Sequence, residues 1–167
     1  KIFVRDSVLK KNGLNFYQSY YLQHSPKLPL IDSKIAVSRD YYTKNIKKKW
    51  ITNFYSQTRS HFLRSRYNCL VSTSKSINED NSLLDCRIEG LENKSPDLVI
   101  LDRNLKLKKK LRLFKAMKNR KILLFTCSKN NKKIMHLKKR GIKVIYIRSL
   151  EEKKDFKNLF LILKKKG

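Results

Sequence analysis

Short apolar runs separated by polar segments organise the second half of the chain. The runs lie at residues 69–71, 97–102, 121–126 and 142–147. Runs of this length, bounded by polar residues, are typical of buried strands. Between the last two runs a helical pattern extends from Asn130 to Arg140, and Gly141 follows where helices commonly end. Strands that alternate with helices predict an α/β fold with parallel strand pairs.

Two further helices are predicted from apolar spacing. Thr52 or Asn53 can cap a helix that ends near Arg66. Its expected inward positions are Phe54, Thr58, Phe62 and either Tyr55 or Leu63. Residues 151–166 form a second amphipathic pattern, with Phe156, Leu159, Phe160 and Leu163 inward.

The first part of the chain carries weaker signals. Pro26 and Pro29 mark a boundary, so residues 1–28 are interpreted as a linker or as the remnant of an upstream domain. Residues 30–37 predict a strand that opens the domain of residues 29–167. Residues 41–49 are expected to form a polar loop, and the lysine-rich residues 105–121 a solvated connection.

A net charge of +28 over 167 residues changes the functional picture. Such a charge is typical of nucleic-acid binding, so a basic nucleic-acid-binding α/β module is one hypothesis. However, the lysines lie between apolar positions, as on the solvated faces of helices, and do not form one compact block. We therefore favour background composition together with attraction to a phosphorylated ligand.

The three cysteines, Cys69, Cys86 and Cys127, match no metal-binding or disulfide spacing. No secretory pattern and no apolar run long enough to cross a bilayer is present in the sequence, so we expect reduced thiols, no metal site and a cytoplasmic location. With only four glycines, the chain also lacks the glycine-rich loops that cradle phosphates. Zinc-deaminase and HExxH patterns are absent, which disfavours nucleophilic and metal-hydrolytic chemistry.

An aromatic residue, two arginines and an acid remain between residues 50 and 87. Trp50 could anchor a helix or offer a flat wall to a cofactor. Arg64 could form a surface ion pair, whereas Arg87 has the bidentate fork that suits a phosphate. Asp80 could lie in a turn or in a functional site, and Ser76 by itself does not distinguish these two roles. His61, which lies in the same region, is interpreted as a packed helix residue.

The order of these residues resembles one enzyme family. The matching segments are Lys34–Asp40 (KIAVSRD, for KIAxSxD), Trp50–Thr52 (WIT), His61–Arg64 (HxLR), Ser76–Arg87 (for TVxxDxPxLxxR) and Val99–Asp102 (VILD). Together they are similar to the reductase domain of the bifunctional riboflavin-biosynthesis deaminase/reductase. The match is ungapped from Trp50 to Arg87.

The resemblance implies a fold like dihydrofolate reductase, with a sheet and flanking helices. It implies an NADPH site lined by Ala36, Trp50, Ser76 and Asp80. It also implies that Arg64, Leu84 and Arg87 hold the substrate, 5-amino-6-(5-phosphoribosylamino)uracil. A hydride would pass from NADPH to the ribose C1, with Asp80 beside the nicotinamide, either moving a proton or orienting groups.

Several positions depart from the family pattern. Lys48 replaces a substrate-binding serine, Gln57 a common arginine and Ser82 a proline. The family's Glu-Gly-Gly loop would follow Gly167, and its zinc deaminase domain would precede this chain. We therefore expect a fragment whose C-terminal part is missing, from an enzyme that forms a homodimer. An inactive remnant is the alternative.

Overall fold

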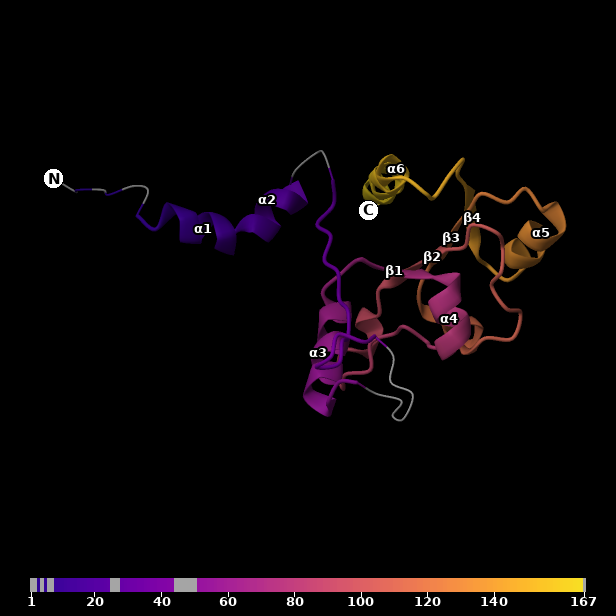
Figure 1. Cartoon of the computed structure of the whole chain (residues 1–167), viewed down its shortest axis with the longest axis horizontal. Helices are drawn as coiled ribbons and strands as arrows, with labels where there is room; N and C mark the ends of the chain where they lie inside the picture. Colours follow the sequence, from indigo (N-terminus) through magenta and orange to yellow (C-terminus); the bar gives the residue numbers. More distant parts are fainter. Residues whose placement is uncertain (1–2, 4, 6–7, 25–27, 44–50, 167) are drawn as a thin grey trace. The chain divides into compact units, whose positions relative to one another are not determined.

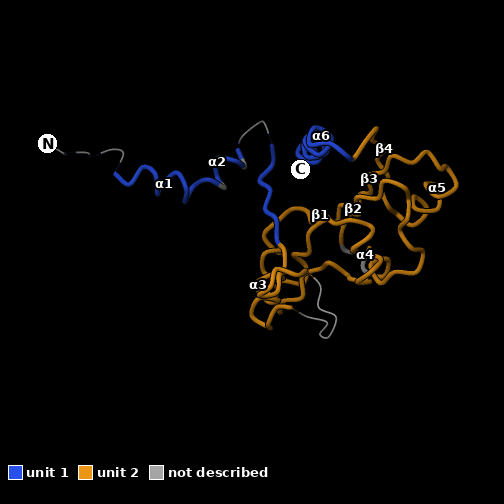
Figure 2. The backbone as a smooth tube through the Cα atoms, in the orientation of Figure 1, with its two compact units in different colours: residues 1–34, 151–167 blue, residues 35–150 orange. Residues whose placement is uncertain are grey.

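The computed structural model describes residues 3, 5, 8–24, 28–43 and 51–166 (Figure 1). The chain forms two compact units, shown separately in Figure 2. One comprises residues 1–34 and 151–167, and the other residues 35–150. The second unit carries the sheet and the predicted substrate-binding residues.

A parallel sheet of four strands forms the centre of the unit of residues 35–150. The strands are β1 (Cys69–Thr73), β2 (Asp97–Leu101), β3 (Ile122–Thr126) and β4 (Lys143–Tyr146), in the order β1-β2-β3-β4. Val71 pairs with Val99, and Val99 with Leu123. All five residues of β3 are buried, as expected for an inner strand of a covered parallel sheet. The four strands predicted from the apolar runs are confirmed.

Short helices connect these strands. Helix α4 (Ser74–Asp80) follows β1, and its cap Thr73 accepts a hydrogen bond from the Ser76 amide. The 3₁₀ segment η1 (Glu92–Lys94) precedes β2, and η2 (Arg112–Asn119) precedes β3. Helix α5 (Asn131–Lys139) joins β3 to β4. The predicted end of α5 is confirmed, because Gly141 adopts a φ of +83° that side chains disfavour.

The predicted helix after Thr52 is confirmed as α3 (Phe54–Ser65), and its cap is Asn53, whose side chain accepts from the Ser56 amide. The predicted inward face is wrong. Phe54 is 75% exposed, Tyr55 80% and Phe62 45%. Polar side chains face the protein instead, because His61 and Arg64 hydrogen-bond to the Asp85 carbonyl. Helix α3 is thus held by polar contacts and partly by Leu63, which is half-buried.

The lysine-rich segment 105–121 also differs from its prediction as a solvated connection. Its leucines Leu105, Leu111 and Leu113 are buried in the core, while the lysines between them are exposed. The remaining core comes from α4, the strands and α5: Ile77, Leu98, Ile100, Ile122, Leu124, Leu137 and Ile142. The high lysine content concealed an apolar face that packs on the sheet.

The strand predicted at residues 30–37 is wrong as well. The structure shows this segment without regular secondary structure, and Ile31, Ile35 and Val37 are exposed. A strand needs a neighbour to pair its backbone groups. Within the described part of the chain, all four strands of the sheet pair only with one another.

The unit of residues 1–34 and 151–167 contains three helices in its described part. These are α1 (Lys10–Phe16), α2 (Gln18–His24) and α6 (Lys153–Lys164). Helix α6 confirms the second predicted amphipathic helix, and a capping box between Glu152 and Asp155 fixes its start. Lys164 Nζ donates to the Leu28 carbonyl at 3.1 Å. No helix among the residues described is long and apolar enough to span a bilayer.

Candidate functional site

The structure brings Arg64 and Arg87 together around His61 and Asp85. Arg64 lies on α3, while Asp85 and Arg87 lie in the loop after α4. Arg64 Nη1 donates to the Asp85 carbonyl at 2.9 Å and lies 3.4 Å from His61 Nδ1. Arg87 Nη2 lies 3.2 Å from His61 Nε2, and Arg87 Nε lies 3.4 Å from Asp85 Oδ1. We call His61, Arg64, Asp85 and Arg87 the arginine cluster.

His61 contacts the three other residues of this cluster and also packs as a residue of α3. Its Nδ1 lies 3.1 Å from the Asp85 carbonyl, and the Arg87 amide donates to the same nitrogen at 3.2 Å. One imidazole nitrogen cannot donate to the carbonyl and accept from the amide at once, so a given neutral tautomer satisfies only one of these two contacts. The His61 carbonyl accepts from Cys86 Sγ at 3.4 Å, and the buried Cys86 lies in the loop after α4.

The cluster carries excess positive charge. Burial lowers the pKa of His61, and Arg64 and Arg87 lower it further, so the imidazole is held neutral. Burial also lowers the pKa of Arg64, with Arg87 adding to the effect. Asp85 supplies the carboxylate, and its buried Oδ1 accepts no hydrogen bond from the described residues. Two guanidinium groups against one carboxylate leave a site that favours a bound anion.

The lowered pKa of His61 predicts a pH dependence of folding. The unfolded chain takes up a proton near the ordinary histidine pKa of 6.5, whereas the folded chain resists protonation until lower pH. Since the unfolded state then binds more protons, the free energy of unfolding should fall as the pH drops from about 7 to about 5. Urea unfolding across this range should show a shallower fall in a His61→Gln variant. Parallel curves for the two proteins would contradict the assignment.

Arg120 is a residue of this region that the sequence did not single out. It follows η2, and its Nη1 donates to the Leu84 carbonyl at 2.7 Å while its Nη2 donates to the Leu83 carbonyl. Burial lowers the pKa of Arg120, while the nearby Asp85 raises it. Leu84 sits in the left-handed region, at φ 55°, which a leucine rarely adopts. Arg120 therefore fixes the loop that carries Leu84 and Arg87, although in sequence it is one cation among many.

Ser76 and Asp80 lie four residues apart on α4 and hence on one face of it. Both are exposed, and Ser76 Oγ lies 3.1 Å from Thr73 Oγ1. Ala36 is half-buried in the segment without regular secondary structure. Trp50 lies outside the described residues. Within the described part, no hydrogen bond or ion pair joins Ser76, Asp80 or Ala36 to the arginine cluster.

A buried carboxylate organises the carboxyl end of β2. Asp102 is 2% exposed, and its Oδ1 accepts from Ser74 Oγ at 2.9 Å and from the Lys106 amide at 2.8 Å. Its Oδ2 accepts from the Leu107 amide at 2.8 Å. Asp102 thus ties α4 to the segment after β2 and is a structural residue. Among the residues described, no group of three or more His, Cys, Asp or Glu could hold a metal ion.

Comparison with known proteins agrees with this fold. The parallel α/β sheet with flanking helices matches the fold of the riboflavin-biosynthesis reductases. That fold resembles the fold of dihydrofolate reductase. The family described as RibD C-terminal domain matches residues 29–167, and the chain belongs to this family. Among curated proteins, none matches the chain.

Three solved structures illustrate the likeness. A deaminase/5-amino-6-(5-phosphoribosylamino)uracil reductase from Thermotoga maritima matches with a TM-score of 0.69 and 22% identity over 95% of this chain. Acinetobacter baumannii RibD matches with a TM-score of 0.71 and 18% identity over 94%. The Saccharomyces cerevisiae riboflavin biosynthesis reductase Rib7 matches with a TM-score of 0.63 and 20% identity over 92% of this chain. The chain spans 42% of each of the first two proteins and 66% of the third.

Proposed function

We propose that this chain forms the reductase part of a riboflavin-biosynthesis enzyme that reduces 5-amino-6-(5-phosphoribosylamino)uracil with NADPH. Its membership of the RibD C-terminal domain family supports a reductase role in this pathway. The single observation that carries the assignment to a phosphorylated substrate is the meeting of Arg64 and Arg87 around a neutral His61. Planar guanidinium groups bind the oxygens of phosphates and carboxylates in pairs, and the proposed substrate carries a phosphate.

The proposed substrate contacts follow from the arrangement of the cluster. Arg87, whose side chain is more exposed than that of Asp85, would bind the ribosyl phosphate from the solvent side. Arg64 would add a second positive charge while its Nη1 continues to hold the Asp85 carbonyl. Leu84, fixed by Arg120, would contact the uncharged part of the substrate. The loop would then enter the reaction already ordered, which lowers the entropic cost of binding.

The proposed cofactor residues are Ala36, Trp50, Ser76 and Asp80. An exposed hydroxyl and an exposed carboxylate on one face of α4 have the chemistry to hydrogen-bond the sugar hydroxyls and carboxamide of a dinucleotide. When bound, NADPH would supply the hydride that the ribose C1 receives. The ring oxygen on that carbon would take up a proton as the C–O bond breaks, leaving the open ribityl chain. Asp80 is the residue proposed to lie beside the reacting atoms.

The proposal extends to the organisation of the protein. Residues 29–167 would be the reductase domain, and residues 1–28 a linker to an upstream deaminase domain or a remnant of that domain. A homodimer would be the working assembly.

The assay that tests the proposal follows NADPH absorbance after the phosphoribosylaminouracil is added to the full-length protein. We expect oxidation of NADPH that requires the substrate, together with formation of the ribitylamino product. The dephosphorylated substrate is the matched control, and it should react far more weakly. A well-folded full-length protein that leaves NADPH unchanged would rule the proposal out.

A further inference from the structure

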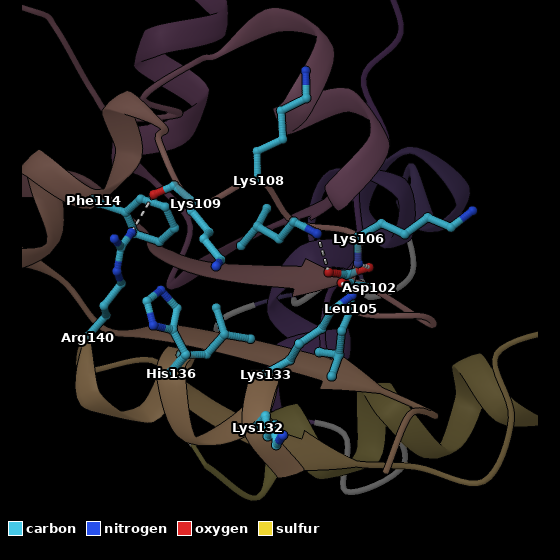
Figure 3. A pocket seen from close by; sticks show the side chains of 12 residues that line it. Asp102, Leu105, Lys106, Lys108, Lys109, Phe114, Lys132, Lys133, His136 and Arg140 are labelled. Carbon is cyan, nitrogen blue, oxygen red and sulfur yellow. Dashed lines mark hydrogen bonds between the residues drawn. The ribbon is translucent and has the colours of Figure 1, made fainter. Parts of the chain in front are cut away.

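A second cationic site lies away from the arginine cluster. A cavity of about 440 Å³ is formed between the segment that follows β2 and helix α5 (Figure 3). Six of its twelve lining residues are Lys or Arg, against 41 of 167 in the whole chain. The cationic residues are Lys106, Lys108, Lys109, Lys132, Lys133 and Arg140, with His136 beside them. The lining is therefore about twice as rich in cations as the whole chain.

Two of these cations are held in place. The Arg140 guanidinium lies 4.6 Å from the centre of the Phe114 ring, and its Nη1 donates to the Lys109 carbonyl. Lys133 Nζ donates to the Leu105 carbonyl at 3.0 Å. Figure 3 shows Arg140 beside Phe114 on one side of the cavity and Lys133 running toward Leu105 on the other. The partners of both cations are neutral, so these contacts do not neutralise either charge.

The lining contains one acid among these cations. It is Asp102, whose two oxygens accept from Ser74 Oγ and from the amides of Lys106 and Leu107. Lys108 Nζ is 3.5 Å from the Asn78 carbonyl, again a neutral group. The cations in the lining outnumber its one carboxylate, and a bound anion would relieve the repulsion among them.

The cavity also has an apolar part. Leu105 and Leu137 are buried in its lining, while Leu107 and Phe114 are half-buried. Apolar side chains beside a group of cations suit an organic ligand that carries phosphate better than they suit an inorganic ion alone. The lining includes none of the residues proposed for the reductase site.

We propose that this cavity binds a small phosphorylated ligand, with the phosphate among Lys109, Lys132, Lys133 and Arg140 and the organic part against Leu105, Leu137 and Phe114. The shared chemistry is a phosphate group, which an inorganic phosphate or a nucleoside monophosphate can supply. The two sources differ in whether the apolar side chains of the cavity add to the binding affinity: they would do so for a nucleoside monophosphate and not for inorganic phosphate. A long polyanion such as single-stranded nucleic acid would instead contact basic residues well beyond this cavity.

Isothermal titration of the full-length protein with inorganic phosphate and with adenosine monophosphate tests the proposal. We expect a Lys109→Gln/Lys132→Gln double variant to weaken binding of the monophosphate by about tenfold or more, since it removes two charges from the phosphate position. The control is Lys94→Gln, an exposed lysine on η1 outside the cavity, which should change the affinity less than about twofold. Unchanged melting temperatures would show that the variants fold.

The outcomes separate the alternatives. Tighter binding of the monophosphate than of phosphate would identify an organic phosphate as the ligand, and equal affinities would identify phosphate itself. Equal weakening in the double variant and in Lys94→Gln would mean diffuse surface charge and would overturn the proposal. So would no binding by the wild type, or binding of a single-stranded oligonucleotide alone.

Discussion

An Arg87→Ala variant of the full-length protein is expected to raise the KM for the phosphoribosylaminouracil by about tenfold to a hundredfold. A charge-assisted hydrogen bond contributes about 1.5–3 kcal/mol, and this range corresponds to that change in affinity. Arg87 is the cleaner of the two arginines to test, because its guanidinium contacts His61 Nε2 and Asp85 Oδ1 and, among the described residues, holds no backbone carbonyl. Arg64 holds the Asp85 carbonyl, so its removal would also loosen the loop.

Two matched variants show whether the geometry or only the charge of Arg87 matters. Arg87→Lys keeps the charge and loses the fork, so its KM should fall between those of wild type and Arg87→Ala. Lys110→Ala removes an exposed charge outside the cluster and should leave KM within about twofold of wild type. Equal effects of Arg87→Ala and Lys110→Ala would mean that Arg87 contributes only to the general surface charge.

The largest effect on folding is expected from Asp102→Ala. The alanine variant removes a buried acceptor that serves Ser74 Oγ and the amides of Lys106 and Leu107. Buried donors left without partners cost about 1–3 kcal/mol each, so a loss of about 3 kcal/mol or more in the free energy of unfolding is expected. Such a loss is a large share of the stability of an ordinary domain.

Urea unfolding of Asp102→Ala and Asp102→Asn provides the measurement. The asparagine keeps one carbonyl acceptor and nearly the same volume, so Asp102→Asn should lose less stability than Asp102→Ala. A loss below about 0.5 kcal/mol in Asp102→Ala would contradict the role of Asp102 as the tie between α4 and the segment after β2.

Much of the fold could be predicted because its signals are local. The buried runs at β2 and β3 are apolar and bounded by polar residues, and Gly141 marks the end of α5. Helix α3 was placed correctly, but its apolar positions gave the wrong face. Its orientation is set by hydrogen bonds from His61 and Arg64 to a loop more than twenty residues away, and helical spacing carries no information about such partners.

The site shows the same division between local and long-range signals. The segments that contain Arg64 and Arg87 could be found from their resemblance to the family's motifs, and the structure places the two side chains together. Arg120 could not be found, because its role depends on the carbonyls of Leu83 and Leu84, which lie 37 and 36 residues earlier in the chain. The strand expected at residues 30–37 failed for a related reason: its alternating residues have no paired neighbour in the described sheet.

Hydride transfer from labelled cofactor tests the central claim most directly. The full-length protein would be supplied with the phosphoribosylaminouracil and NADPH carrying deuterium at the transferable position of the nicotinamide, and the product analysed by mass spectrometry. The proposed function predicts a ribitylamino product that carries one deuterium, on the former ribose C1. A folded, full-length protein that yields no such product, or a product without deuterium at that carbon, would contradict it.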